Sequence, residues 1–457
     1  MIAPGSSSAS RPAQEDFAAT LARFACALTI DELAPPVRDA VKANLFDTLA
    51  CAAAGSSAAG VTELLALARE WAGAPQASIL VFGDALPAHH AALVNGTMAH
   101  ARDYDDTHDA ATLHGGVSVV PAAMAAAGLR GGVPGRDLAA AVAAGLETIC
   151  RLGVSTTIGI VDSGYMYTAL FGYFAATVAA GRVLGLDEQQ MVNALGIVYS
   201  QAAGNHQVSR DGALTKRMQP GFAAMSGVLS AQMARRGIRG VQSTFEGADG
   251  LLRVYLHDHC DRERLRDGLG QRFELLGLSY KPYPVAKRVR RIRVGINRLA
   301  YEVVCTPVDV RKAPATIVEA QFSIPYAVAT ALVDGTVELG HFSEAALGRR
   351  DIMALAGRVE AYVDQDLERE WGRKTSPALL TMELDDGTIH RARADWALGH
   401  PNNPMSTDAF DAKALDCMRA AAVALGPAHV QALRQRVDSL ETLVDARAIA
   451  EALTPAR

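Results

Sequence analysis

DLAAAVAAGLETICRLG, residues 137–153, and LDEQQMVNALGIVYSQAAG, residues 186–204, are the stretches that set the fold class of this chain. Each begins with an acidic or helix-capping residue and closes on glycine, which is favoured just beyond a helix end. Both are largely apolar between those ends. They therefore predict two buried helices that end at Gly153 and Gly204.

Similar patterns fill the chain on both sides of these stretches. Of the 457 residues 50% are apolar and only 6% aromatic, so the core consists of Ala, Leu and Val, and Ala and Leu favour helices. A chain of this length exceeds what one core usually supports. We expect a mainly α protein, with a large all-helical domain formed by residues 15–277 and 400–457. The Ser/Ala/Pro-rich residues 1–14 are expected to be a disordered lead without a secretory signal.

The pattern changes near Leu278. Residues 279–296 and 299–310 are rich in Val and Ile, and residues 379–399 alternate around Asp386-Gly387, which is typical of a hairpin. Two helical patterns, residues 322–335 and 345–364, lie between these strands. The sequence thus predicts a smaller α+β domain over residues 278–399.

Composition excludes several classes of function. The net charge of −5 gives no basic surface for nucleic acid, and six cysteines without C-x-x-C pairs suit reduced thiols in the cytoplasm. The uncharged residues 164–181 hold three glycines and three tyrosines, so we interpret them as a buried helix and expect no membrane span. His89-His90 and the His257–Cys260 segment are interpreted as a helix entry and a charged loop, so no metal site is predicted.

Residues 95–116, NGTMAHARDYDDTHDAATLHGG, concentrate four aspartates and three histidines between apolar flanks. Such groups cost several kcal/mol to bury unpaired. The stretch is therefore either one wall of a water-filled cleft or a solvated loop. Asp105, Asp106 and Asp109 are interpreted as helix caps or solvated groups.

Two basic segments follow. Lys216 and Arg217 lie in GALTKRMQPGFAA, residues 212–224, where the alternatives are a solvated connection and an anion site whose lysine acts as a base. KPYPVAKRVRRIR, residues 281–293, has six basic residues in thirteen. An arginine there that faced a cleft would bind a carboxylate bidentately.

At these places the sequence resembles the MmgE/PrpD family. The resemblance rests on D-x-D-D-T and H-x-G within residues 103–116, T-K-R-x-Q-x-G-F-A-A at 215–224, K-x-Y-P at 281–284 and A-Q-F-S-I-P-Y-A-V-A at 320–329. It implies a large all-helical domain, a smaller α+β lid domain, a homodimer, and a cofactor-free site for small polycarboxylates at the domain junction. By position, it assigns active-site roles to Asp103, Thr107, His114 and Lys216.

The chain departs from the family at two positions. Gly164-Tyr165-Met166 stands where dehydratase and decarboxylase members commonly carry Gly-aromatic-His, and Ala286 or Arg290 stands at a second family histidine. Two acid/base groups are therefore expected to be missing. Epimerisation α to a carboxylate needs only two opposed acid/base groups and a cation for the enolate-like intermediate.

These departures favour an epimerase of an iminodisuccinate-like dicarboxylate. Lys216 and His114 are the expected opposed pair, Asp103 orients them, and Thr107 contacts substrate. Carboxylate or other substrate contacts are expected from the basic-segment residues Arg217, Arg290, Lys281 and Tyr283. The alternatives are a hydro-lyase of the 2-methylcitrate type, a decarboxylase of the cis-aconitate type, and a non-catalytic polycarboxylate-binding protein.

Overall fold

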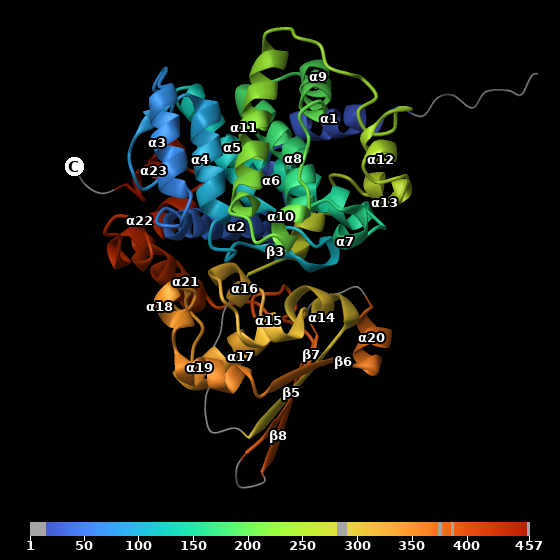
Figure 1. Ribbon diagram of the computed structural model, residues 1–457. Helices are drawn as coiled ribbons and strands as arrows, with labels where there is room; N and C mark the ends of the chain where they lie inside the picture. Colours follow the sequence, from blue (N-terminus) through green and yellow to red (C-terminus); the bar gives the residue numbers. More distant parts are fainter. Residues whose placement is uncertain (1–14, 281–289, 373–376, 385–387, 455–457) are drawn as a thin grey trace, which may run out of the picture.

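The computed structural model describes residues 15–280, 290–372, 377–384 and 388–454, and it confirms a mainly helical protein with a smaller α+β part (Figure 1). One large hydrophobic cluster joins helices from the beginning and the end of the chain, and we call this assembly the helical part. Two smaller clusters lie among the segments from Arg291 to Ala394, which we call the α+β part. The domain boundaries expected from the sequence stay a prediction.

The helical part begins with thirteen α-helices and is completed by the last three in the described residues. The first are α1 Phe17–Ala27, α2 Pro35–Gly55, α3 Val61–Trp71, α4 Ala88–His100, α5 Gly116–Leu129, α6 Gly135–Ser155, α7 Ile160–Ser163, α8 Tyr167–Leu184, α9 Glu188–Tyr199, α10 Gln207–Arg210, α11 Thr215–Arg235, α12 Leu251–Val254 and α13 Arg262–Arg266. The last are α21 Thr407–Arg419, α22 Pro427–Asp438 and α23 Arg447–Glu451. Short elements connect them: η1 Ile30–Glu32, η2 Asp109–Ala111, η3 Glu274–Gly277, β1 Ala77–Ser78, β2 Ala85–Leu86, β3 Thr107–His108 and β4 Leu278–Ser279.

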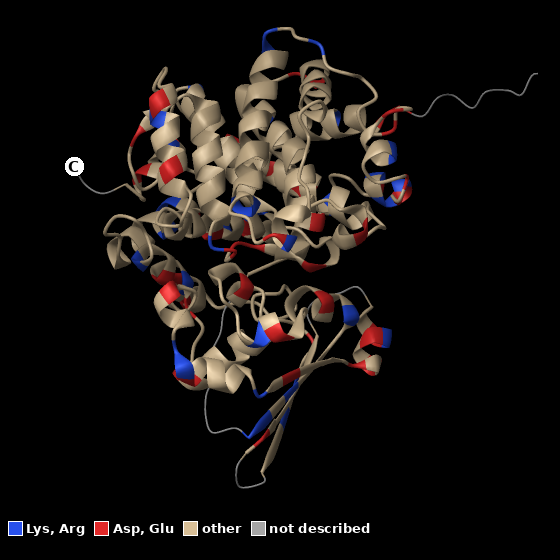
Figure 2. Ribbon diagram, in the orientation of Figure 1, with Lys and Arg blue, Asp and Glu red and all other residues tan. Residues whose placement is uncertain are grey.

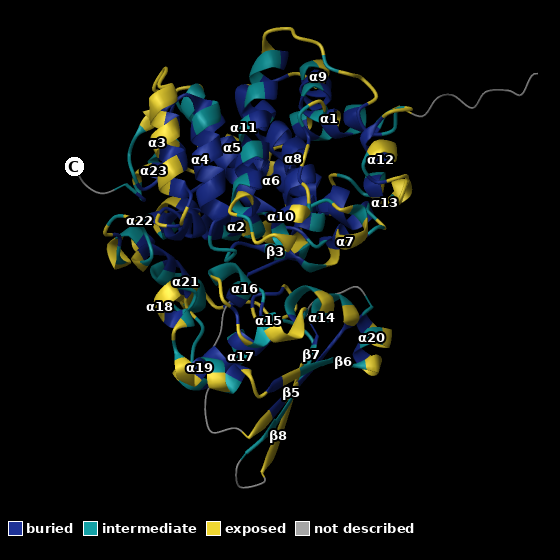
Figure 3. Cartoon of the chain, viewed as in Figure 1, coloured by how far each residue is buried: buried dark blue, intermediate teal, exposed yellow. Residues whose placement is uncertain are grey.

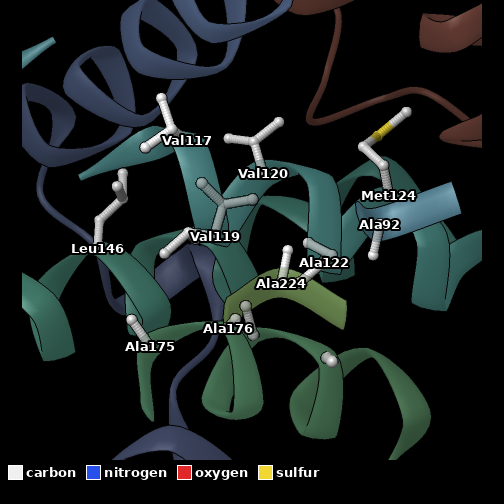
Figure 4. Close-up of a cluster of buried hydrophobic side chains, with 14 of the residues drawn as sticks. Ala92, Val117, Val119, Val120, Ala122, Met124, Leu146, Ala175, Ala176 and Ala224 are labelled. Atoms are coloured by element: carbon white, nitrogen blue, oxygen red, sulfur yellow. The ribbon is translucent and has the colours of Figure 1, made fainter. Parts of the chain in front are cut away.

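Helix α5 lies at the centre of the helical part. Figure 4 shows Val119 of this helix among Leu146 of α6, Ala175 and Ala176 of α8, and Ala224 of α11. Figure 3 shows the same helices as the most deeply buried region of the molecule. Small residues let these helices approach closely.

The crossing of α4 and α11 is especially close. A Cβ added at Gly221 would lie 2.4 Å from the carbonyl oxygen of Leu93, and one added at Gly96 would lie 2.9 Å from Cα of Gly221. Both positions therefore require glycine. The crossing brings the C-terminal end of α4 beside the N-terminal end of α11.

Two expected helices differ slightly in length. Helix α6 continues two residues past Gly153 to Ser155, and α9 ends at Tyr199, before Gly204. Among the described helices, α6 alone is long and apolar enough to cross a membrane, and all of its apolar window is buried against other helices. The stretch 164–181 lies largely in α8, whose side chains are buried almost throughout, as expected.

The α+β part is built on a four-stranded sheet in the order β6-β5-β7-β8. Its strands are β5 Arg291–Ile296, β6 Val359–Val363, β7 Ala378–Glu383 and β8 Ile389–Ala394, with only β5 and β6 parallel. Its helices are α14 Arg298–Val304, α15 Val308–Lys312, α16 Ile317–Gln321, α17 Ile324–Asp334, α18 Glu344–Leu347, α19 Arg350–Ala356 and α20 Gln365–Trp371, with η4 Leu339–His341. The antiparallel pair β7 and β8 confirms the predicted hairpin, although residues 385–387 lie outside the described residues.

Two sequence expectations in this part are wrong. Residues 299–310 were expected to be extended, but they form most of α14 and the start of α15. The side chain of Asn297 accepts a hydrogen bond from the backbone N–H of Ala300 at 3.1 Å and so starts α14 despite the valines. Residues 359–363 were expected to continue a helix, but they form β6 because pairing with β5 buries Val359.

Candidate active site

The segment between α4 and α5 lies on the side of the helical part that faces the α+β part. Figure 2 shows charged residues of this segment and of the beginning of α11 gathered there. His100 is the last residue of α4, and β3 pairs with β4 through Thr107 and Ser279. Asp103 has a positive φ of 54°, a conformation that most side chains avoid. The segment is thus pinned at both ends and turns sharply at Asp103.

A buried carboxylate links two histidines of this segment. Oδ2 of Asp105 lies 2.9 Å from Nδ1 of His100 and 3.2 Å from Nδ1 of His114. Nδ1 of His114 also lies 2.6 Å from the carbonyl oxygen of Asp106. Because both acceptors face Nδ1, this nitrogen carries the proton in neutral His114, and Nε2 is left as the reactive atom.

Lys216 completes the cluster from the first turn of α11. Its ammonium forms an ion pair with Oδ2 of Asp103 and lies 3.4 Å from Nε2 of His100. Nε2 of His114 lies 3.8 Å from the other oxygen of Asp103. Lys216 and His114 therefore flank the carboxylate of Asp103, and two carboxylates, two imidazoles and an ammonium form one connected cluster.

Exposure separates two layers in this cluster. The side chains of His114, Asp103 and Lys216 are 16%, 15% and 9% exposed, whereas those of His100 and Asp105 are 2% and 0% exposed. The first three therefore keep some contact with solvent, while the other two lie behind them. The ring of Phe322 from the α+β part covers the Lys216 ammonium at 4.9 Å.

The aspartates next to the cluster have different roles. The carboxylate of Asp106 accepts hydrogen bonds from the backbone N–H groups of Gly115 at 2.6 Å and Gly116 at 2.9 Å, so it caps the start of α5 as expected. Burial, with the charge of Asp105, raises its pKa to about 6. The same interpretation is wrong for Asp105, which neither caps a helix nor faces water but bonds two imidazoles.

The structure does not bring together all the residues that the sequence singled out. Arg290 is 66% exposed and pairs with Glu383 at 3.2 Å on the sheet, away from the Lys216 cluster. Arg217 lies next to Lys216, and its Nη1 donates to the carbonyl oxygen of Ala59 at 3.0 Å. The hydroxyl of Thr107 is buried, and the described residues offer it no hydrogen-bond partner. Lys281 and Tyr283 lie outside the described residues.

His100, like Asp105, is a residue of this cluster to which the sequence analysis gave no site role. His100 stands at the end of an apolar helix, three positions before Asp103. That position in the sequence could have identified it as a candidate site residue. Thr168 was missed as well: its hydroxyl accepts a hydrogen bond from the backbone N–H of His114 at 3.0 Å and ties the segment to α8. Met166, the position at which the sequence analysis expected a histidine to be missing, directly precedes α8 and lies two residues before Thr168, with its sulfur 3.7 Å from Oγ of Ser209.

His100, Asp105 and His114 also meet the geometric condition for a metal site, since one possible ligand atom of each lies within 4.8 Å of the others. The hydrogen bonding fits proton transfer better. Nδ1 of His114 is already engaged by a carbonyl oxygen, and the Lys216 ammonium beside His100 would repel a metal cation. The absence of a metal stays a prediction.

Comparison with known proteins gives two family matches. A model described as the MmgE/PrpD N-terminal domain matches residues 19–263, and one described as the MmgE/PrpD C-terminal domain matches residues 272–441. The second match extends through α21 and α22, which pack on the helical part. The two matches together span most of the chain.

Curated relatives match over nearly their full length. A cis-aconitate decarboxylase of Aspergillus terreus (strain NIH 2624 / FGSC A1156) is 25% identical over 430 residues, covering 86% of this chain and 87% of the relative. The cis-aconitate decarboxylase of Homo sapiens is 25% identical over 447 residues, covering 92% and 90%. A cis-aconitate decarboxylase-like protein of Aspergillus oryzae (strain ATCC 42149 / RIB 40) is 24% identical over 467 residues, covering 93% and 95%. The names of these relatives support a lyase and give no support to the expected epimerase.

Proposed function

This chain belongs to the MmgE/PrpD family, and on that premise we propose that it is a lyase that decarboxylates a small unsaturated tricarboxylate of the cis-aconitate type. The observation that carries the proposal is the contact of the Lys216 ammonium with Asp103 and His100 beside the partly exposed His114. Relatives that carry the name cis-aconitate decarboxylase support the choice of reaction.

The chemistry of decarboxylation sets what such a site must supply. When the C–C bond to the departing carboxylate breaks, its electron pair stays on carbon and spreads through the double bond to a neighbouring carboxylate. A proton must then be added to carbon, and the departing group leaves as CO₂. The enzyme therefore needs positive charge beside the delocalised anion and a positioned proton donor.

Lys216 and His114 match these two needs. The ammonium of Lys216 supplies the positive charge in a place that the ring of Phe322 screens from water. The protonated Nε2 of His114 supplies the proton to carbon, because Asp105 and the carbonyl oxygen of Asp106 hold the opposite nitrogen. His100 and Asp105 act from behind as positioning residues.

The geometry also bears on the expected epimerase. That reaction requires Lys216 and His114 to approach one carbon from opposite faces. Both instead contact Asp103, each through a different oxygen, so this carboxylate occupies the place beside both groups. Asp103 is better placed to hold the charges of Lys216 and His114 until the substrate arrives.

The test is incubation with cis-aconitate in deuterated water, followed by NMR and by measurement of released CO₂. We expect CO₂ and an unsaturated dicarboxylate that carries one deuterium on carbon. Lys216→Ala should lower kcat by about a hundredfold or more. Arg235→Ala, at the exposed far end of the same helix, is the matched control and should leave kcat unchanged. Water addition without CO₂ release would instead assign a hydro-lyase.

Several wider expectations become part of the proposal. We propose a cytoplasmic homodimer that needs no cofactor and binds neither nucleic acid nor membrane. Size-exclusion chromatography with light scattering tests the dimer, and activity after exhaustive dialysis against a chelator tests the need for metal. A monomer at micromolar concentration, or activity restored only by a divalent ion, would contradict the corresponding part.

A further inference from the structure

Arg102 lies between two residues of the site, His100 and Asp103, but its side chain points to the turn between α2 and α3. Its Nε donates to the carbonyl oxygen of Ala54 at 3.2 Å, and its Nη2 donates to Oγ of Ser57 at 2.7 Å. Both acceptors are neutral. The guanidinium of Arg102 is therefore hydrogen-bonded, but neither of these two hydrogen bonds goes to a negatively charged group.

Arg217 reaches the same turn from α11. Its Nη1 donates to the carbonyl oxygen of Ala59, which lies five positions beyond Ala54 in the chain. Among the ion pairs formed by the described residues, neither Arg102 nor Arg217 has a carboxylate within 4.0 Å. The two guanidinium groups thus bracket one turn, and neutral oxygens are their partners there.

This arrangement carries an electrostatic cost. Burial lowers the pKa of Arg102, and the like charge of Arg217 lowers it further. Burial also lowers the pKa of Arg217, which the charge of Asp103 partly offsets. A guanidinium has five N–H donors, and the hydrogen bonds among the described residues use two in Arg102 and one in Arg217. Positive charge and spare donors are therefore both available for an anion.

The pair borders the place where the α+β part meets the site. The side-chain amide of Gln321, at the end of α16, donates to the backbone carbonyl oxygen of Arg102 at 2.8 Å. Arg217 directly follows Lys216 on α11. The charge of Asp103, which pairs with Lys216, also acts on Arg217, and the charge of Arg217 acts on Arg102, so the two arginines border the cluster.

From this juxtaposition we propose that Arg102 and Arg217 bind a carboxylate of the substrate that does not react. The inference rests on the proposed function. It requires a substrate that carries, besides the carboxylates held by the Lys216 cluster, one further carboxylate for the two arginines. Planar guanidinium groups bind carboxylates through paired N–H donors, which suits this ligand chemistry. Arg102 is then a specificity-determining residue.

A purely structural role is the competing explanation, because Ala54 lies in the last turn of α2 and a cation there stabilises the helix end. Binding of two unreactive probes separates the two explanations. Tricarballylate is a saturated tricarboxylate, and glutarate is a dicarboxylate of similar length. Isothermal titration calorimetry gives the Kd of each for the wild type and for Arg102→Gln, and calorimetric Tm values report folding.

We expect Arg102→Gln to weaken tricarballylate roughly ten- to hundredfold and to change glutarate less than about twofold. Arg102→Lys should recover part of the loss. Arg130→Gln is the matched control, because that guanidinium also donates to a carbonyl oxygen at a helix end, Val183 at 2.8 Å. It should leave both Kd values unchanged.

Equal weakening of both probes, or a lower Tm with unchanged Kd values, would overturn the assignment and leave Arg102 as a helix cap. The proposed lyase would survive either result. A wild-type protein that binds neither probe would instead contradict the proposed function together with the subsite.

Discussion

At the scale of single residues, Asp105 decides how the site is organised. It is fully buried, and its Oδ2 holds Nδ1 of both His100 and His114. A carboxylate in that place fixes which ring nitrogen carries the proton and stabilises an imidazolium when one forms. The neighbouring Asp106 has the different task of capping α5, although the two residues are chemically identical.

That difference leads to a prediction on pH. Burial raises the pKa of Asp106 from its ordinary 3.8 to about 6 in the folded protein. Between about pH 4 and about pH 6, Asp106 is protonated in the folded protein but ionised in the unfolded chain. The free energy of unfolding therefore falls as pH rises through this range. The fall is on the order of 2–3 kcal/mol.

Asp106→Asn removes the titrating group and should remove that fall. The free energy of unfolding, measured in urea at about pH 4 and about pH 7, should show a smaller loss for the variant than for the wild type. Asp162→Asn changes an exposed aspartate in α7 and serves as control. Parallel pH profiles for the wild type and Asp106→Asn would contradict the assignment of this proton to Asp106.

At the scale of elements, the site depends on the close crossing of α4 and α11. His100 ends one helix and Lys216 begins the other, so their 3.4 Å contact is set by how closely the two backbones approach. Gly96 and Gly221 permit that approach. The same crossing explains why His100 was missed, because its partner Lys216 lies 116 residues away in the sequence.

Gly221→Ala should therefore damage both stability and activity. The added methyl would lie 2.4 Å from the carbonyl oxygen of Leu93, so the helices must separate. We expect a loss of about 2 kcal/mol or more in the free energy of unfolding, with a lower kcat in the fraction that stays folded. Gly357→Ala is the control, since no neighbouring atom lies closer than 3.6 Å there. Unchanged urea unfolding and kcat would show that the crossing can relax.

The sequence pattern predicted helices and strands correctly where the residues of a segment favour only one of the two structures. The apolar stretches that became α6 and α8 could form little else, and the residues around Asp386-Gly387 predicted the hairpin of β7 and β8. The prediction failed at residues 299–310 and 359–363, where the same valines suit either structure. A capping side chain, Asn297, decided the first, and pairing with β5 decided the second.

The site was predictable to a similar degree. Asp103, His114 and Lys216 do meet, as the family resemblance implied. Arg290 does not join them, because sheet register places it beside Glu383. Register and helix crossings depend on contacts between distant segments, which the spacing of residues along the chain does not encode.

At the scale of the whole molecule, the site segment is held from the far end of the chain. Lys413 of α21 is buried, its ammonium lies 2.6 Å from Oδ1 of Asp47 in α2, and it donates to the carbonyl oxygen of Tyr104 at 2.7 Å. It also lies over the ring of Tyr104 at 4.3 Å. The peptide between Asp103 and Asp105 is thus fixed by a helix that follows the entire α+β part.

Removal of this lysine should show how much that support matters. Lys413→Met leaves Asp47 buried without its cation, which should cost about 3–5 kcal/mol in the free energy of unfolding. The double variant Lys413→Met with Asp47→Asn removes both charges and should recover a large part of that cost. Both variants should lose kcat, since each lacks the hydrogen bond to Tyr104. Asp47→Asn alone completes the comparison, and additive effects of the two single substitutions in the double variant would mean that the ion pair does not couple the two helices.

The position of Lys413 has a consequence for biosynthesis. This lysine and Tyr104, whose carbonyl oxygen it binds, are 309 residues apart in the sequence. During translation, α2, α4 and α11 leave the ribosome long before α21, so the nascent chain carries every acid/base residue of the site without the helix that fixes their loop. A ribosome-bound chain arrested before residue 407 should therefore be catalytically silent, and activity would begin only when α21 emerges and docks.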